Sequence, residues 1–172
     1  MNALNEAAPR QAGLLLSEIV GGDLRLVLNN TMSAVEDGRH QILRYLEPWG
    51  VGGAARNRLE VVFEELVSNT IRHGFEPRSD QIILVSVAVK PGAIELAFED
   101  DGLPFNPLES PEPEPFTSLE EARLGGLGIP LILKLSTNVR YEPIPLGTAG
   151  HIIDGRPFKP CNRIKVSIAN SA

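Results

Sequence analysis

The sequence has a single cysteine and no long hydrophobic run. Cys161 alone cannot form an internal disulfide, and three scattered histidines do not make a metal-ligand spacing. No apolar segment approaches the roughly 20 residues that a bilayer-spanning helix needs. The apolar residues 14–16 follow no basic cluster, so they make a poor signal peptide. We therefore expect a cytoplasmic protein that does not enter a membrane.

The chain also lacks an excess of positive charge. Its 16 Lys and Arg residues are outnumbered by 22 Asp and Glu residues, which gives a formal net charge of −6. Phosphate backbones are bound through basic surfaces, so this balance argues against direct nucleic-acid binding. A protein partner or a small-molecule ligand fits better. Internal repeats and dividing linkers are absent from the 172 residues, which predicts a single domain.

Apolar residues recur at helical spacing along residues 59–75, which predicts a helix packed on a core. They are Leu59, Val62, Phe63, Leu66, Val67 and Thr70. One shoulder of this stripe carries Glu65, Asn69, Arg72 and His73. A carboxylate followed one turn later by an amide suits phosphoryl transfer, because the amide oxygen can bind Mg²⁺ and the carboxylate can take a hydroxyl proton. The alternative is a solvated helix flank.

A hairpin of two strands is predicted at residues 81–89 and 94–100. Asp100 continues the face formed by Ile94, Leu96 and Phe98, so its carboxylate points toward the core. A buried unpaired charge is costly, so we expect Asp100 to accept hydrogen bonds from nearby backbone or from a ligand.

Gly102 follows this strand and lets the backbone approach something closely. The alternative is that residues 100–102 are only a turn signal.

Glycines also precede the apolar helical segment at residues 129–136. Gly125, Gly126 and Gly128 would expose free N–H groups at the positive end of the helix dipole, which suits a phosphate. The spacing is neither that of a P-loop nor that of a Rossmann fingerprint. A glycine-rich hinge is the competing interpretation.

The other elements are predicted from local patterns. Strands are expected at residues 24–28, 138–142 and 163–169, with at most a short helix at residues 14–20. Ser33 resembles a helix N-cap, with Glu36 completing a capping box.

Two proline-rich segments are predicted to be irregular. Residues 106–117 suggest a mobile flap, and residues 143–162 a long loop with a short strand at residues 151–153.

Taken together, three of these segments resemble the GHKL (Bergerat-fold) ATPases, and most closely the anti-sigma factor serine/threonine kinases of bacterial partner-switching systems. Residues 65–69, followed by His73, resemble the N-box of that family. Residues 100–107 resemble its first glycine box in the DDGxPFxP form, and residues 123–129 resemble its second glycine box.

The resemblance covers about residues 24–141 and the final strand. It implies an α+β fold, a two-layer α/β sandwich of the Bergerat type with a mixed, mostly antiparallel sheet covered on one face by helices. The domain would span residues 23–172, after an N-terminal extension at residues 1–22. The ATP lid would lie at about residues 104–124. The loop at residues 143–162 is longer than the tight hairpin usual there.

The resemblance also implies a role for each matched residue. Asn69 would bind the Mg²⁺ that bridges the phosphates of ATP, and Glu65 would orient or deprotonate the serine hydroxyl of a protein substrate. Asp100 would accept a hydrogen bond from the exocyclic amino group of adenine, and Gly102 would allow close passage of the nucleotide. Further nucleotide contacts are expected from Arg72, His73, Arg123, Gly125, Gly126 and Gly128.

For two of these residues, a role that does not involve the nucleotide is the alternative. His73 could stabilise the end of its helix through the dipole. Arg123 could be a solvated lid residue instead of a ligand for the terminal phosphate.

The implied function is that of an ATP-dependent serine/threonine kinase that acts as an anti-sigma factor. Its partners would be a sigma factor and an antagonist protein of the STAS type, and a homodimer is compatible with the resemblance. The alternative is a nucleotide-gated binding regulator with little or no kinase activity, which the long loop favours. A detached catalytic domain of a histidine kinase would need a phosphoacceptor helix pair, and His40 lacks the residues that usually follow such a histidine.

Overall fold

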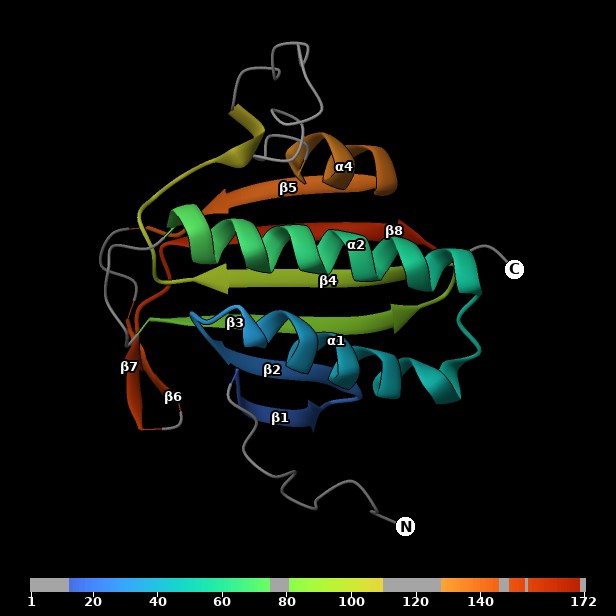
Figure 1. The fold of residues 1–172 in the computed structure, drawn as a ribbon, viewed down its shortest axis with the longest axis horizontal. Coiled ribbons are helices and arrows are strands. Elements are labelled where there is room, and N and C mark those ends of the chain that lie inside the picture. The colour runs from blue at the N-terminus through green and yellow to red at the C-terminus, as the bar shows by residue number, and fades with distance from the viewer. Residues whose placement is uncertain (1–12, 75–80, 110–127, 146–148, 154, 171–172) are drawn as a thin grey trace.

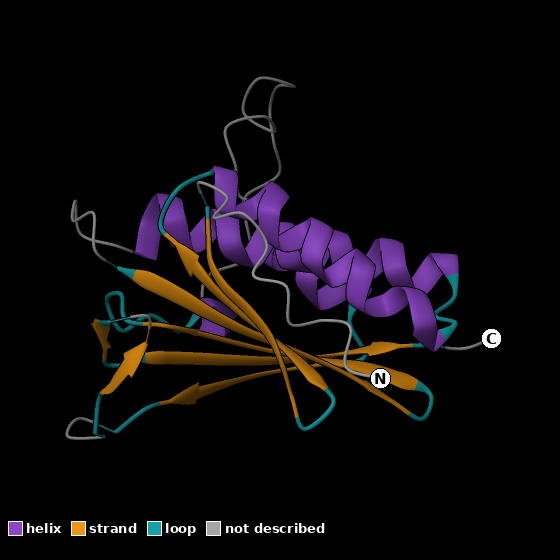
Figure 2. Ribbon diagram, turned by 90° about the horizontal axis from the view of Figure 1, so that it is seen from below, coloured by secondary structure: helices purple, strands orange, loops and turns teal. Residues whose placement is uncertain are grey.

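The computed structural model describes residues 13–74, 81–109, 128–145, 149–153 and 155–170 (Figure 1). It shows a two-layer α+β fold in which helices cover one face of a twisted sheet (Figure 2). The six strands of that sheet have the order β1-β2-β3-β4-β8-β5. Every described strand pair is antiparallel. The predicted fold class is therefore confirmed, with antiparallel pairing throughout the described sheet.

The strands of the large sheet are β1 (Leu14–Val20), β2 (Asp23–Asn29), β3 (Ile82–Lys90), β4 (Ala93–Asp100), β5 (Asn138–Pro143) and β8 (Asn162–Ala169). A small hairpin consists of β6 (His151–Ile153) and β7 (Arg156–Phe158). The helices are α1 (Ser33–Leu46), α2 (Gly53–Asn69) and α4 (Gly128–Leu135). Shorter turns are η1 (Glu47–Trp49), the π-helical η2 (Thr70–Gly74) and η3 (Pro107–Glu109). None of the described helices is both long and apolar enough to cross a membrane.

The main core lies between the helices and the sheet. Helix α1 packs over β2, α2 over β4 and β8, and α4 beside β5 (Figure 1). The predicted stripe of α2 supplies much of this core: Leu59, Val62 and Phe63 are fully buried, and Thr70 at its end is half-buried. Because α2 is held along its apolar stripe, its shoulder with Glu65 is directed to one end of the sheet.

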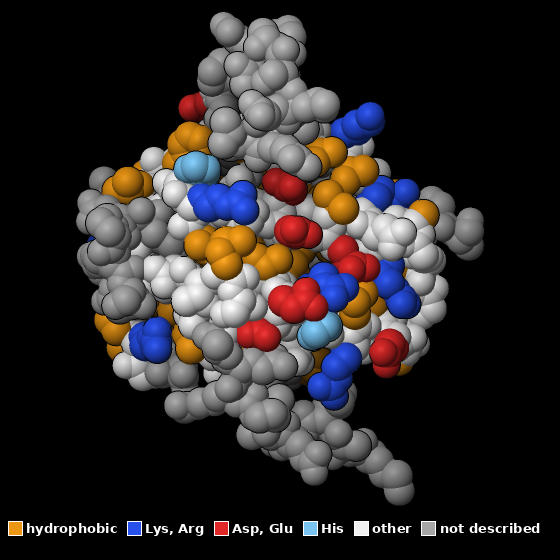
Figure 3. Space-filling model, in the orientation of Figure 1, with side chains coloured by type: hydrophobic (Ala, Val, Ile, Leu, Met, Phe, Trp, Pro, Cys, Tyr) orange, Lys and Arg blue, Asp and Glu red, His pale blue; other side chains and the backbone are white. Residues whose placement is uncertain are grey.

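Charged side chains of both signs are interspersed over the helical face (Figure 3). Arg39 of α1 contacts Glu36 at 2.9 Å and Glu60 of α2 at 3.0 Å. The pair with Glu36 lies within α1, and the pair with Glu60 links the two helices. Partly exposed pairs of this kind each contribute at most about 1 kcal/mol.

A second, smaller core lies on the other face of the sheet. The side chains of Val27 and Ile82 alternate with those that face the helices, so they point to the opposite side. Phe158 of β7 is 1% exposed and packs against both. The β6–β7 hairpin is therefore attached to the sheet through Phe158.

The N-terminal prediction is wrong in one respect, because residues 14–20 form strand β1 and not a short helix. Strand β1 pairs with β2 through a turn at Gly21 and Gly22, whose φ angles are +62° and +94°. Two consecutive positive φ angles match the twist of a tight hairpin, and glycine adopts them without strain. The strand lies within the segment 1–22 that was expected to be an extension.

The predicted capping box at Ser33 is also wrong. Helix α1 begins at Ser33, its N-cap residue is Met32, and no side chain caps it. The Ser33 hydroxyl lies 2.8 Å from the hydroxyl of Thr31, and Glu36 pairs with Arg39. These competing contacts account for the missing cap.

The remaining elements agree with their predictions within a few residues. The strand at residues 151–153 is present, and β7 is an additional strand that pairs with it. The proposed flap at residues 106–117 is described only as far as Glu109, where η3 forms one turn.

Candidate functional site

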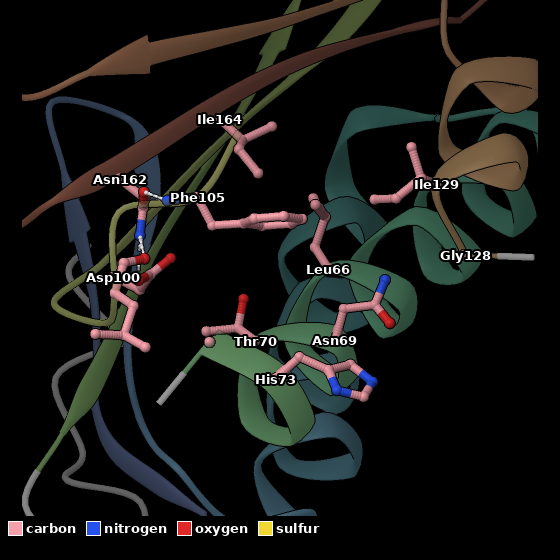
Figure 4. Close-up of a pocket in the computed structure, with 12 residues that line it drawn as sticks. Leu66, Asn69, Thr70, His73, Asp100, Phe105, Gly128, Ile129, Asn162 and Ile164 are labelled. Carbon is pink, nitrogen blue, oxygen red and sulfur yellow. Dashed lines mark hydrogen bonds between the residues drawn. The ribbon is translucent and has the colours of Figure 1, made fainter. Parts of the chain in front are cut away.

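A pocket of about 250 Å³ lies between the C-terminal end of α2, the ends of β4 and β8, and the start of α4 (Figure 4). Two of the three motif segments meet at this pocket with the last two residues of the third, Gly128 and Ile129. The lining residues are Leu66, Asn69, Thr70, His73, Gly74, Asp100, Leu103, Phe105, Gly128, Ile129, Asn162 and Ile164.

One wall of the pocket is the predicted shoulder of α2 and η2. Asn69 is half-buried and lines the pocket, with His73 one turn later (Figure 4). Glu65 precedes Asn69 by one turn and is half-buried, whereas Arg72 is exposed beside His73. The last turn of this helix is π-helical, a form often found at functional sites.

Gly128, the first residue of α4, lies directly against this shoulder. A Cβ atom at position 128 would be 2.6 Å from both Glu65 Oε2 and Asn69 Nδ2. Glu65 Oε2 and Asn69 Nδ2 therefore lie no more than twice 2.6 Å from each other. The start of α4 thus adjoins a carboxylate and an amide that face the same point.

The carboxyl group of Glu65 is perturbed by its surroundings. Partial burial raises its pKa, the neighbouring Glu64 carboxylate raises it further, and Arg72 lowers it. A raised pKa makes Glu65 a stronger proton acceptor once it is ionised, which is the property a general base needs.

Asp100 lies at the opposite side of the pocket and is 4% exposed, as its position on the core face predicted. Its Oδ1 atom accepts hydrogen bonds of 2.9 Å from the backbone N–H of Gly102 and from Asn162 Nδ2. The pKa of Asp100 is raised to about 6, mainly by burial; the two hydrogen bonds oppose this rise, and the Asp101 carboxylate adds to it. Within the described chain both of these donors bind Oδ1, so Oδ2 is left to accept from a ligand.

Gly102 does make a close approach, but the partner is the chain's own backbone. A Cβ atom at position 102 would lie 2.2 Å from the carbonyl oxygen of Gly74. The same carbonyl accepts a 2.9 Å hydrogen bond from the N–H of Leu103. The first glycine box is thereby joined to the end of the N-box helix.

Asn162 and Phe105 are among the pocket residues that sequence reasoning did not propose for the site. Asn162 is 4% exposed and contacts Asp100, and Phe105 lines the pocket while 58% of the residue is exposed (Figure 4). Asn162 stands at the end of a long irregular segment, where no local pattern marks it. Phe105 lies within residues 100–107, which resemble the first glycine box, so its place in that motif could have identified it as a pocket residue.

Some predicted contacts lie outside the described residues. They are Arg123, Gly125 and Gly126, together with residues 110–124 of the expected lid.

The side chains at the α2 shoulder suit a hard cation such as Mg²⁺. Asn69 offers an amide oxygen and Glu65 a carboxylate, and Mg²⁺ typically uses one or two protein oxygens plus phosphate oxygens. Among the described residues there is no group of three or more His, Cys, Asp or Glu side chains that could hold a metal. A site built with substrate phosphates needs no such group.

Comparison with known proteins gives a family match and several relatives. Residues 28–152 match the family described as "Histidine kinase-like ATPase domain". An anti-sigma F factor of Priestia megaterium is 26% identical over 49% of this chain and 58% of its own length. An anti-sigma F factor of Bacillus subtilis (strain 168) is 26% identical over 52% of this chain and 62% of its own length. The chain thus spans about three-fifths of these relatives.

One solved structure is also similar. It is the histidine kinase domain of a blue-light activated histidine kinase from Erythrobacter litoralis EL346. That domain is 17% identical, with a TM-score of 0.39 over 68% of this chain and 45% of its own.

Proposed function

Because the chain belongs to the histidine kinase-like ATPase domain family, we propose that its pocket binds ATP and that the protein transfers the terminal phosphoryl group to a serine or threonine hydroxyl of another protein. The observation that carries the proposal is the meeting of Glu65 and Asn69 at Gly128, beside a pocket with a buried carboxylate at its other side.

The base of ATP would bind at the Asp100 side of the pocket. The exocyclic amino group of adenine would donate a hydrogen bond to Oδ2 of Asp100, whose Oδ1 is held by two donors. Leu66, Phe105 and Ile164 supply apolar surface for the faces of the ring. A small number of polar groups within an apolar lining is typical of a ligand pocket.

The phosphates would lie toward the α2 shoulder and the start of α4. Asn69 would contribute an oxygen to Mg²⁺, which when bound offsets the negative charge that develops on the transferring phosphoryl group. Arg72 and His73 are exposed beside Asn69 and would add positive or hydrogen-bonding groups. The further phosphate contacts proposed from the second glycine box are Arg123, Gly125, Gly126 and Gly128.

Glu65 would act on the attacking hydroxyl. It accepts the hydroxyl proton as the hydroxyl oxygen bonds to the terminal phosphorus, and the bond from that phosphorus to the bridging oxygen breaks. The products are ADP and a phosphorylated side chain. If the site acts on a protein hydroxyl, as proposed, hydrolysis of ATP by water should be slow.

The proposed cellular role is that of an anti-sigma factor in a bacterial partner-switching system. The support is that the relatives are named anti-sigma F factor, although the chain spans only part of their length. Its partners would be a sigma factor and a STAS-type antagonist that receives the phosphoryl group, and it could act as a homodimer in the cytoplasm.

A second candidate is a nucleotide-gated binding regulator with little or no transfer activity. The β6–β7 hairpin favours it, because this addition to the sheet presents Ile152 with 74% of the residue exposed. A hairpin that is anchored to the sheet through Phe158 and carries an exposed apolar side chain at Ile152 offers a point of contact for a protein partner.

The test uses purified protein, Mg²⁺, γ-labelled ATP and a STAS-domain protein from the same source. We expect label on a serine or threonine of that protein with the wild type. Glu65→Gln should bind ATP but transfer label at least about 100-fold more slowly, since general base catalysis contributes that much. Glu64→Gln, on the exposed neighbour, is the matched control and should retain transfer. ATP binding without transfer by the wild type would favour the second candidate.

A further inference from the structure

Asn162 stands directly opposite Asp100 in the sheet. The two residues are register partners on the antiparallel strands β4 and β8, and both are 4% exposed. Side chains of directly paired residues lie on the same face of a sheet, close enough to interact. Figure 4 shows the amide of Asn162 directed at the carboxylate of Asp100.

All four hydrogen-bonding positions of the Asn162 amide are used. Its Nδ2 donates to Asp100 Oδ1 and to the carbonyl of Leu103, each at 2.9 Å. Its Oδ1 accepts from the N–H of Phe105 and from the hydroxyl of Tyr141, each at 2.9 Å. A flipped amide would bring donor against donor and acceptor against acceptor, so these partners fix one orientation.

This orientation has a consequence for Asp100. Asn162 Nδ2 and the N–H of Gly102 both bind Oδ1, so the carboxylate is prevented from rotating and Oδ2 faces the pocket. An ionised carboxylate only accepts hydrogen bonds. A base with an amino group at that point can donate to Oδ2, whereas a base with a keto oxygen there brings two acceptors together.

We propose that Asn162 is the positioning residue that orients Asp100 and so makes the pocket selective for a purine with an exocyclic amino group over one with a keto oxygen in its place. The inference deepens the proposed function, on which it rests. The same amide binds Leu103 and Phe105, so it also fixes the first residues of the segment after β4, one of which lines the pocket with its ring.

The positioning role of Asn162 can be tested through the pH dependence of ATP binding, because several titratable groups surround Asp100. Asp101, Tyr141 and Cys161 carry the acidic groups near it, and His73 lines the same pocket. Of the groups that lower the pKa of Asp100, the Asn162 hydrogen bond has the largest effect. Its removal raises the pKa further, so ionised Asp100, and with it ATP binding, should then require a higher pH.

The experiment measures Kd values of ATP and of ITP, which carries a keto oxygen in place of the amino group, for wild type and Asn162→Ala. We expect the preference for ATP over ITP to fall by about 10-fold in Asn162→Ala, the usual worth of a hydrogen bond to a charged group. The pH at which ATP binding is half lost should also rise. Ser167→Ala is the control, because it removes the 2.8 Å hydrogen bond to Glu95 elsewhere on β8.

A merely structural role predicts another result. If Asn162→Ala weakened ATP and ITP equally and left the pH midpoint unchanged, the inference would be overturned. Should Asn162→Ala fail to fold, Tyr141→Phe removes only one donor to the amide and should lower the ATP preference in the same direction by a smaller factor. A wild type that binds ATP without preferring it to ITP contradicts this inference alone, and one that binds neither nucleotide contradicts the proposed function as well.

Discussion

Gly128 and Asn69 approach so closely that position 128 has no room for a side chain. An added Cβ would lie 2.6 Å from Asn69 Nδ2 and equally close to Glu65 Oε2. The first residue of α4 and the N-box shoulder therefore constrain each other.

Gly128→Ala should impair the site more than the fold. The added methyl group must displace the Asn69 and Glu65 side chains, whose ends can move, so we expect a small change in melting temperature. Displacing both functional groups by about 1 Å should weaken ATP binding or transfer by about 10-fold or more. Calorimetric ATP titration and a thermal melt measure the two effects.

The control for that substitution is Gly53→Ala. Gly53 is also the first residue of a helix, and a Cβ atom added there would have no neighbouring atom within 4 Å. Equal ATP affinity in the two variants would contradict a constraint between Gly128 and the N-box.

Asp100→Asn should stabilise the protein at neutral pH. The pKa of Asp100 is raised from 3.8 to about 6, so its contribution to stability is complete below pH 3.8 and is lost as pH rises through about 6. An amide keeps an oxygen for the donors of Gly102 and Asn162 but never ionises. The free energy of unfolding at pH 8 should therefore exceed that of wild type, by up to about 3 kcal/mol.

Urea unfolding at pH 8 and near pH 4 checks this expectation. The difference between Asp100→Asn and wild type should narrow at the lower pH, where Asp100 is protonated in the folded protein. The same variant should bind ATP less tightly. A variant less stable than wild type at pH 8 would argue that Asp100 is not destabilising when ionised.

Phe158→Ala should detach the β6–β7 hairpin from the sheet. Phe158 is 1% exposed against Val27 and Ile82, and truncation of a buried Phe typically costs about 3–5 kcal/mol. Urea unfolding measures the loss, and limited proteolysis within residues 143–162 should become faster. Ile152→Ala on the same hairpin is the control, since Ile152 is 74% exposed, and should be nearly neutral.

Gly102→Ala should be destabilising for a backbone reason. The new Cβ would lie 2.2 Å from the carbonyl oxygen of Gly74, and that atom cannot move without disturbing the 2.9 Å hydrogen bond from Leu103. Overpacking of this kind typically costs about 1–3 kcal/mol. A thermal melt indistinguishable from that of Gly53→Ala would contradict the joint between the glycine box and the helix.

Much of the fold could be predicted because its signals are local. The 3.6-residue period of α2 and the alternation in β4 depend only on which side chains must be buried, so Phe63 and Asp100 lie as predicted. Where a local pattern fits more than one structure, the prediction from the sequence was wrong. Residues 14–20 contain a run of leucines that does not separate helix from strand, and the pairing of β1 with β2 decides for strand.

The candidate site could be predicted only in part. Glu65, Asn69, Asp100 and Gly128 belong to segments with recognisable spacing, and the structure brings them around one pocket. Asn162 could not be found in this way, because it is 62 residues from Asp100 and adjoins a long irregular segment.

The sequence by itself determined most of the helices and strands and the inward direction of Asp100, because side-chain periodicity and burial act over a few neighbouring residues. The two-layer arrangement was implied by the family resemblance. Only the tertiary structure decided that Asn162 faces Asp100, that Gly102 meets Gly74, and that Phe158 closes a second core against Val27. Those contacts depend on strand register and on the path of a long loop, which are set by the packing of distant segments.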